Sequence, residues 1–470
     1  MLISAVTFAK QVTTDLFATD ILYWVATGAV VLAIAGVILV DVGLVQRKNV
    51  LDTCVQKLVG CFIGMMSFIV FGFGMWNWQF YTAFGTKNAY GQAISDWWLG
   101  GTFMRHFASA LSPTAAPAAD NSQIFLAFVG IYAGFVCVLI HAAASERLKA
   151  KAYYIMCVGI GAVAYPLLLW LTWGSTSPLT NKGVHDFVGD FVGYIFAGTF
   201  ALVLAWRLGP RRGIFTPDQG RPWVPYNTAL TGVGVVLLLF AVPLVALGCG
   251  YFFPGVGYFG ISMSTSGFGI VLTNVYVAFC GGTLVGGLLA YRTKNVLHVL
   301  LGPLSGYLAG TAGFDVLLPW QMLIISMVAP LVVAGVYEWL RRRQIDESKV
   351  IPLGVGAGIY GAIVVGFVAW HTKTGGYVGI TSGTYRFQGA EITPWWQLVG
   401  VAVAVGFGLV SALVLVVGLD RVMAIRVSRS VEEEGLDTSY WGAPPVGAEL
   451  ATESSPSALA TPVGGAAGSP

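Results

Sequence analysis

The sequence predicts an all-α integral membrane protein of about eleven transmembrane helices. Of its 470 residues, 56% are hydrophobic and only 10% are charged, whereas a soluble domain carries about 25% charged residues. Apolar runs of about 20 residues, the length that crosses a bilayer core, recur along most of the chain. Lys and Arg gather in every second segment between these runs. The three observations together predict helices surrounded by lipid.

The apolar runs define the predicted spans in order. The 61 glycines agree with this prediction, because membrane helices use small residues for close packing. Pro243 lies inside the sixth run and is expected to bend or break that helix. The eighth run is the shortest, which leaves a tilted or a re-entrant helix open. The spans are predicted at residues 20–44, 52–76, 122–145, 151–173, 187–208, 228–250, 267–291, 295–312, 317–340, 350–370 and 394–420.

The distribution of basic residues predicts the orientation. With the N-terminus outside, eighteen of the 25 lysines and arginines fall in cytoplasmic segments and six in external ones. Cytoplasmic loops of membrane proteins carry such an excess. The chain is therefore predicted to be N-out and C-in, a multi-pass protein of the plasma membrane, with the lipid bilayer as its surroundings.

Several features exclude other classes. The net charge of +3 indicates no nucleic-acid partner. None of the six cysteines forms a CxxC pair, so neither a metal site nor a disulfide framework is expected. The sequence contains no phosphate-binding Gly loop and no nucleophile elbow, so we expect neither an enzyme nor a cofactor. The stretch 443–470 is rich in Pro, Ala, Gly and Ser and is predicted to be a disordered tail.

Eight short segments carry a resemblance to one family. Residues 43–51, 142–153 and 186–198 (DFVGDFVGYIFAG) are similar in order and spacing to segments of the ammonium transporter (Amt/Mep/Rh) family. The Tyr165 to Trp173-Gly174 spacing fits the same pattern, as do 208–213, 301–310, 354–362 (GVGAGIYGA) and 426–437 (RVSRSVEEEGLD). The resemblance covers roughly residues 20–440.

The resemblance implies an architecture and a set of partners. It implies a five-plus-five inverted repeat with an extra helix, a homotrimer, and a pore at the centre of each protomer. The membrane domain would cover 1–425. The C-terminal segment 426–442 would be cytoplasmic, where related tails couple protomers and meet PII-type regulators. The substrate would be ammonium or another small solute.

The resemblance also assigns roles to residues at matching positions. An outer recruitment site, suited to ammonium through cation–π contacts, would include Trp173, the gate residue Phe128, and Cys249 in place of a Ser. Val245 would stand at a second gate position that is usually Phe. The two pore histidines of the family would be replaced by Tyr194 and Gly354, and Gly354 would open space in the pore.

Two aspartates precede Tyr194 at intervals of four residues. Asp186 matches an Asp of the family, and we expect it to cap a helix N-terminus. Asp190 replaces a Gly, and one hypothesis is that Asp190 and Tyr194 form a polar path in the pore. Hydrogen bonding to a neighbouring span, or packing at a trimer interface, is an equally open alternative.

The sequence therefore predicts ammonium/ammonia transport with an altered proton relay and selectivity. Tyr has an unperturbed pKa near ~10 and is a poor proton shuttle at neutral pH. One alternative is a non-conducting ammonium sensor in which Tyr194 plugs the pore. A channel for another small solute is the other.

Overall fold

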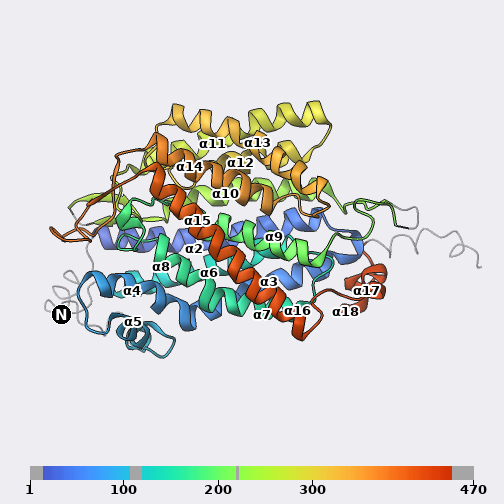
Figure 1. Ribbon diagram of the computed structural model, residues 1–470, viewed down its shortest axis with the longest axis horizontal. Coiled ribbons are helices and arrows are strands. Elements are labelled where there is room, and N and C mark those ends of the chain that lie inside the picture. Colours follow the sequence, from blue (N-terminus) through green and yellow to red (C-terminus); the bar gives the residue numbers. More distant parts are fainter. Residues whose placement is uncertain (1–13, 106–118, 219–221, 254, 447–470) are drawn as a thin grey trace, which may run out of the picture.

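A computed structural model describes residues 14–105, 119–218, 222–253 and 255–446 of the chain. Its helices run side by side along the long axis, and loops gather at the two ends of the bundle (Figure 1). Within the described residues, nine helices are long and apolar enough to cross a membrane, and two shorter apolar helices accompany them. The predicted all-α multi-pass fold is confirmed. The exact number of crossings, the N-out orientation and the inverted repeat remain predictions.

The helices agree with the predicted spans to within a few residues at most ends. The first two spans are the exceptions: the first helix already begins at Thr14 rather than at residue 20, and the second continues from residue 76 to Ala83. The helical segments are α2 (Thr14–Gly43), α3–η2–α4 (Val50–Ala83), α5 (Ala89–Trp97), α6 (Ala119–His141), α7–η5–α8 (Ala150–Thr172), η7–α9 (Asp190–Leu208), α10 (Thr228–Leu247), α11 (Phe268–Thr293), α12 (Leu297–Gly310), α13 (Pro319–Arg342), η8–α14 (Pro352–Val368), α15–η9–α16 (Pro394–Val422), α17 (Arg429–Glu434) and α18 (Leu436–Trp441).

Helix α6 and the helix formed by η7 and α9 lie at the centre of the bundle. In each, 83% of the most apolar window is buried. The peripheral helices instead present large apolar side chains outward, including Trp24, Phe62, Phe240, Leu284 and Val414. Such a surface is typical of a protein solvated by lipid tails. The central helices are therefore the ones that can enclose a path.

Two π-helical turns meet at the centre. Turn η7 (Asp190–Ile195) begins the fifth span and turn η8 (Pro352–Gly358) begins the tenth. Their helices cross where Gly198 and Gly354 face each other. Single π turns inside α-helices are frequent at functional sites.

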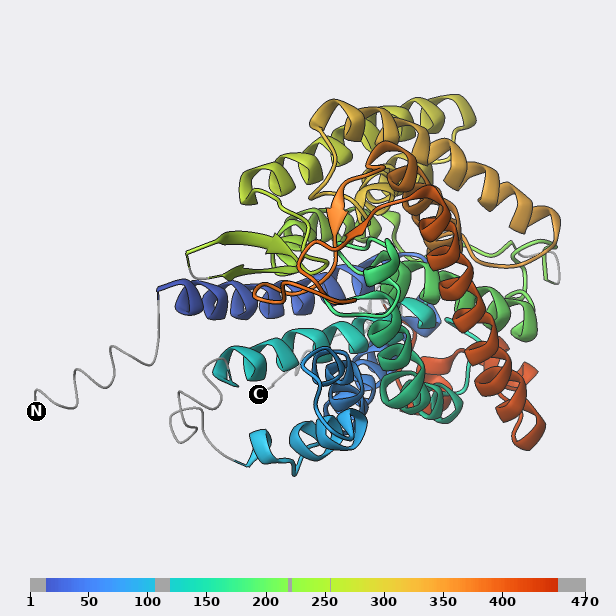
Figure 2. The same ribbon diagram turned by 60° about the vertical axis from the view of Figure 1, so that its left-hand side comes forward.

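The two ends of the bundle differ in chemistry. At one end, here called the aromatic end, α5 and the hairpin of β1 (Gly250–Phe253) and β2 (Gly257–Gly260) lie near Trp76 and Trp173. The pair β3 (Lys373–Thr374) and β4 (Ala390–Glu391) belongs to a second short sheet. Helices α17 and α18 cover the opposite, basic end (Figures 1 and 2).

One local expectation is wrong in part, and another lies mostly outside the described residues. Pro243 does not break the sixth span, because α10 continues as a helix to Leu247. The predicted disordered tail at 443–470 falls mostly outside the described residues, which end at residue 446.

Candidate functional site

The three residues expected to recruit substrate meet in one small cavity near the aromatic end. Phe128 from α6, Trp173 at the end of α8 and Cys249 after α10 all line it. Tyr132 and Tyr165 complete its aromatic wall. Its volume is about 10 Å³, which is room for about one water-sized molecule. We call this space the aromatic cavity.

Neighbouring aromatic rings fix the walls of the aromatic cavity. The Trp173 indole stacks parallel to Phe125 with ring centroids 6.2 Å apart, and its N–H donates to the Phe187 carbonyl at 3.3 Å. The Trp76 N–H donates to the Trp173 carbonyl at 2.8 Å. Phe125 and Phe128 lie 5.9 Å apart. These contacts fix the orientation of the buried Trp173 ring, with Phe125 stacked against one of its faces.

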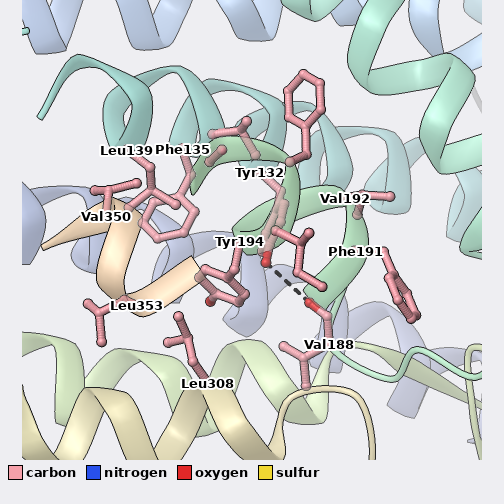
Figure 3. Close-up of a cluster of buried hydrophobic side chains, with 14 of the residues drawn as sticks. Tyr132, Phe135, Leu139, Val188, Phe191, Val192, Tyr194, Leu308, Val350 and Leu353 are labelled. Carbon is pink, nitrogen blue, oxygen red and sulfur yellow. Dashed lines mark hydrogen bonds between the residues drawn. The ribbon is translucent and has the colours of Figure 1, made fainter. Parts of the chain in front are cut away.

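Tyrosine rings separate the aromatic cavity from a second space. Tyr132 lines the aromatic cavity, whereas Tyr194 lines the second one, which we call the central cavity. The Tyr194 ring meets Phe135 and Tyr307 edge-on, each at 6.5 Å between centroids. Tyr132 donates to the Val188 carbonyl at 3.1 Å (Figure 3). Tyr194 therefore stands at the boundary between the cavities, with its side chain directed among Leu353, Leu308 and Phe135 (Figure 3).

The central cavity is walled almost entirely by apolar groups. Its volume is about 70 Å³, enough for a few waters or one small solute. It runs from Tyr194 and Tyr307 toward the basic end, where Asp41 and Lys349 complete its wall. Of the described residues that line the two cavities, none is a histidine. Leu353, rather than an imidazole, faces Tyr194 from the tenth span (Figure 3).

The expectation that Gly354 opens space in the pore is wrong. A β-carbon at residue 354 would overlap the backbone carbonyl of Tyr194 and press on Gly198. The glycine is needed because the fifth and tenth spans cross in contact there. Gly354 still lines the central cavity together with Tyr194, so the two residues share the wall of one space.

Val245 and Asp190 line neither the aromatic cavity nor the central cavity. Among the described residues that line the aromatic and central cavities, neither of the two is present. Val245 lies one turn before Cys249, and its carbonyl accepts the Cys249 thiol at 3.3 Å. A gate at Val245 and a polar path through Asp190 are therefore not supported by this geometry.

Asp186 and Asp190, at the start of the fifth span, differ in their contacts. One oxygen of Asp186 accepts the backbone N–H groups of Gly189 and Asp190 at 2.9 and 2.7 Å, and the other accepts that of Phe191 at 3.0 Å. These bonds satisfy the free N–H groups of a helix start. Asp190 is fully buried against Gly358, with the Thr311 side chain beside its carboxyl group.

A network of ion pairs closes the basic end. Glu146 accepts Arg211 at 2.9 Å, and Asp346 binds both Arg211 (2.7 Å) and Arg147 (3.4 Å). Burial alone would raise the pKa of the Asp346 carboxyl, but the two guanidinium groups hold it well below its usual range. Burial lowers the pKa of Arg147 to about 10. Asp346 and Arg147 are therefore both charged at neutral pH.

The C-terminal segment docks on this end of the bundle. Asp437 accepts the backbone N–H groups of Leu51 and Asp52, at 3.0 and 2.8 Å, and so caps the start of α3. Arg426 binds Glu432 at 2.9 Å and also donates to the Leu208 carbonyl. The segment thus bridges the first loop and the end of the fifth span.

The described residues can be compared with metal sites and with known families. In the part of the chain that the structure describes, no group of three or more His, Cys, Asp or Glu could hold a metal ion. A model of the Ammonium Transporter Family matches residues 21–444. The chain belongs to the ammonium transporter family. This is a family of transporters or channels rather than enzymes, as the sequence predicted.

Relatives within the family match the chain over most of its length. It is 27% identical over 442 residues to the ammonium transporter Amt2 of Methanocaldococcus jannaschii, covering 91% of each chain. It is 28% identical to a putative ammonium transporter of Methanothermobacter thermautotrophicus, covering 88% of this chain and 94% of the relative.

Solved structures share the ammonium transporter fold. A structure titled Sensor Amt Protein superposes with a TM-score of 0.71 at 20% identity, over 91% of this chain and 99% of that one. Candida albicans Mep2 gives a TM-score of 0.65 at 17% identity, over 89% and 88%.

Sequence reasoning missed several aromatic residues in or beside the two cavities. Tyr132 and Phe125 lie outside the motifs and Tyr307 lies within the segment 301–310, but the resemblance assigned none of the three a role. The spacing of Tyr132, four residues after Phe128 on α6, is the one signal that could have placed it beside the predicted gate.

Proposed function

We propose that the chain carries ammonium across the plasma membrane as neutral ammonia, along a path from the aromatic cavity past Tyr194 into the central cavity. The observation that supports this proposal is the apolar wall of the central cavity. A bare ammonium ion in such a space would lose its hydration without compensation. Ammonia is small, neutral and able to hydrogen-bond the tyrosine hydroxyls in passing.

Trp173, Phe128 and Cys249 form the recruitment site of this proposal. Indole and phenyl faces attract a cation through their negative π faces, and a thiol is a weaker donor and acceptor than a serine hydroxyl. Ammonium would therefore be held mainly by the rings. The ion would give its proton back to the water outside the aromatic end, and neutral ammonia alone would enter the central cavity.

The altered proton relay follows from Tyr194. A phenol does not exchange its proton readily at neutral pH, because its unperturbed pKa is near ~10. Tyr194 and Gly354 thus provide a path for ammonia without the imidazole pair that passes protons in the family. We expect the protein to move ammonia with little accompanying charge.

Reconstitution into liposomes tests the proposal. The internal pH change on ammonium addition reports ammonia flux, and the capacitive current on a supported membrane reports charge. The proposal expects flux that exceeds that of empty liposomes, with a current near background. Trp173→Leu should raise the ammonium concentration needed for half-maximal flux several-fold. Ammonia flux accompanied by one charge for each molecule moved would contradict the proposed alteration of the proton relay.

A non-conducting ammonium sensor is the second candidate, because Tyr194 stands between the two cavities. In the same assay such a protein would bind ammonium without flux, and Tyr194→Ala would create flux. Passage of another neutral solute, such as urea, with neither ammonium binding nor ammonium flux, would indicate a channel for another small solute.

The assembly and regulation that the family resemblance implies also remain proposals. The apolar outward faces of the peripheral helices are compatible with packing in a homotrimer. The docked segment 426–442 offers a surface at the basic end where a PII-type regulator could bind. Cross-linking of purified protein in lipid nanodiscs, and co-sedimentation with a PII protein, test these two points.

A further inference from the structure

A cluster of three charges lies where the central cavity reaches the basic end. Asp41 of α2 binds Lys57 of α3 at 2.6 Å through one oxygen and Lys349 at 3.0 Å through the other. The Lys57 and Asp41 side chains are 0% and 1% exposed, and that of Lys349 is 11% exposed. Buried charges require partners, and Lys57 with Asp41 already satisfies this requirement. With Lys349 as well, Asp41 has one cationic partner more than charge balance requires.

Lys349 occupies a special position between two spaces. One is the central cavity, and the other is a vestibule at the basic end lined by Arg211, Trp223 and Asp346 among others, with a volume of about 360 Å³. Among the described residues, Lys349 is the one that lines both. A solute that leaves the central cavity in this direction must pass its ammonium group.

The backbone on either side of Lys349 is braced. Glu347 accepts the N–H of Lys349 and that of Ile351, both at 2.8 Å, and so turns its carboxylate toward the backbone. Asp346 is held by Arg147 and Arg211. Of the carboxylates near Lys349, only Asp41 shares the wall of the central cavity with it among the described residues.

We propose that Lys349 is a cation barrier that makes the passage selective for neutral solutes. Its ammonium group occupies the Asp41 oxygen that a free cation would otherwise use. A cation arriving through the apolar cavity then meets a like charge with no carboxylate left to bind it. Neutral ammonia meets no such repulsion. This inference rests on the proposed function, because it assigns the selectivity of that path.

Cation currents in proteoliposomes test the barrier. Gradients of KCl and of ammonium chloride are applied to the wild type, Lys349→Gln and Lys349→Arg, and each measurement is repeated with Tyr194→Ala to remove the other constriction. Gln keeps a donor for Asp41, and Lys349→Met is a second neutral variant should Gln fold poorly. Lys149→Gln, outside the cavities, is the matched control.

The proposal expects the neutral variants to pass both K⁺ and ammonium at least tenfold faster than their Lys parents in the Tyr194→Ala background. The substitution Lys349→Arg retains the positive charge and should keep the passage closed to cations. Folded neutral variants without any gain in cation current would overturn the barrier. The K⁺ measurement does not depend on ammonia transport, so failure of the proposed function in the wild type is recognised separately.

Discussion

The carbonyl oxygen of Tyr194 fills the space that a β-carbon on residue 354 would need. The missing side chain at residue 354 therefore does not widen the path. It allows the fifth and tenth spans to touch, and the touching spans leave Tyr194 and Leu353 to shape the passage. This contact predicts how the protein responds to substitutions at glycine.

Gly354→Ala should destabilise the protein by about 1–3 kcal/mol, because the added methyl group overpacks the crossing. Gly335→Ala is the matched control, since nothing lies within 4 Å of a β-carbon there; it should be neutral or slightly stabilising. Thermal unfolding in detergent compares the two. Equal melting temperatures would show that the crossing is looser than described.

Asp190→Asn should leave ammonia flux within about twofold of the wild type, since Asp190 lies outside both cavities. The substitution should also change the melting temperature little, because the amide has nearly the shape of the carboxyl group and can still hydrogen-bond the neighbouring Thr311 side chain. Liposome flux and thermal unfolding measure the two effects. A folded variant without ammonia flux would show that Asp190 takes part in transport.

Asp346→Ala should lower the free energy of unfolding by about 3–5 kcal/mol at neutral pH, because the substitution leaves the buried Arg147 without its carboxylate partner. The pKa of Asp346 is lowered in the folded protein, so its contribution is present above the unfolded pKa of ~3.9 and is lost as pH falls toward the folded value. The difference in melting temperature should persist at pH 5 and shrink below about pH 4.

Asp218→Ala serves as the control for this series. Asp218 pairs with Arg212, and its side chain is 37% exposed, so its loss should change stability by less than about 1 kcal/mol. A difference between wild type and Asp346→Ala that vanished already at pH 6 would contradict the assigned pairing.

Asp437→Ala should release the C-terminal segment from the basic end. The substitution removes the two bonds to the start of α3, and the loss of such a capping side chain costs about 0.5–2 kcal/mol. Hydrogen exchange should rise at residues 50–52 and 436–441. In Glu434→Ala, which loses a contact to Ser439 within the segment itself, exchange at residues 50–52 should stay as in the wild type.

The spans could be predicted because lipid imposes the length and the polarity of a crossing helix. The packing of those spans could not. Gly354 was interpreted as empty space because a sequence shows which side chain is missing but not which backbone fills its place. Lys349 gave no signal either: in the sequence it is one more basic residue near a span, and its role depends on Asp41, which lies 308 positions earlier.

The pairing of Asp41 with Lys57 has a consequence for biogenesis. The two residues lie on consecutive spans, and each span alone would bring an unmatched ion into the hydrocarbon layer. When the first two spans form a helical hairpin, the two side chains neutralise each other as an ion pair. Entry of the nascent chain into the bilayer is therefore cheapest when both segments leave the insertion machinery together.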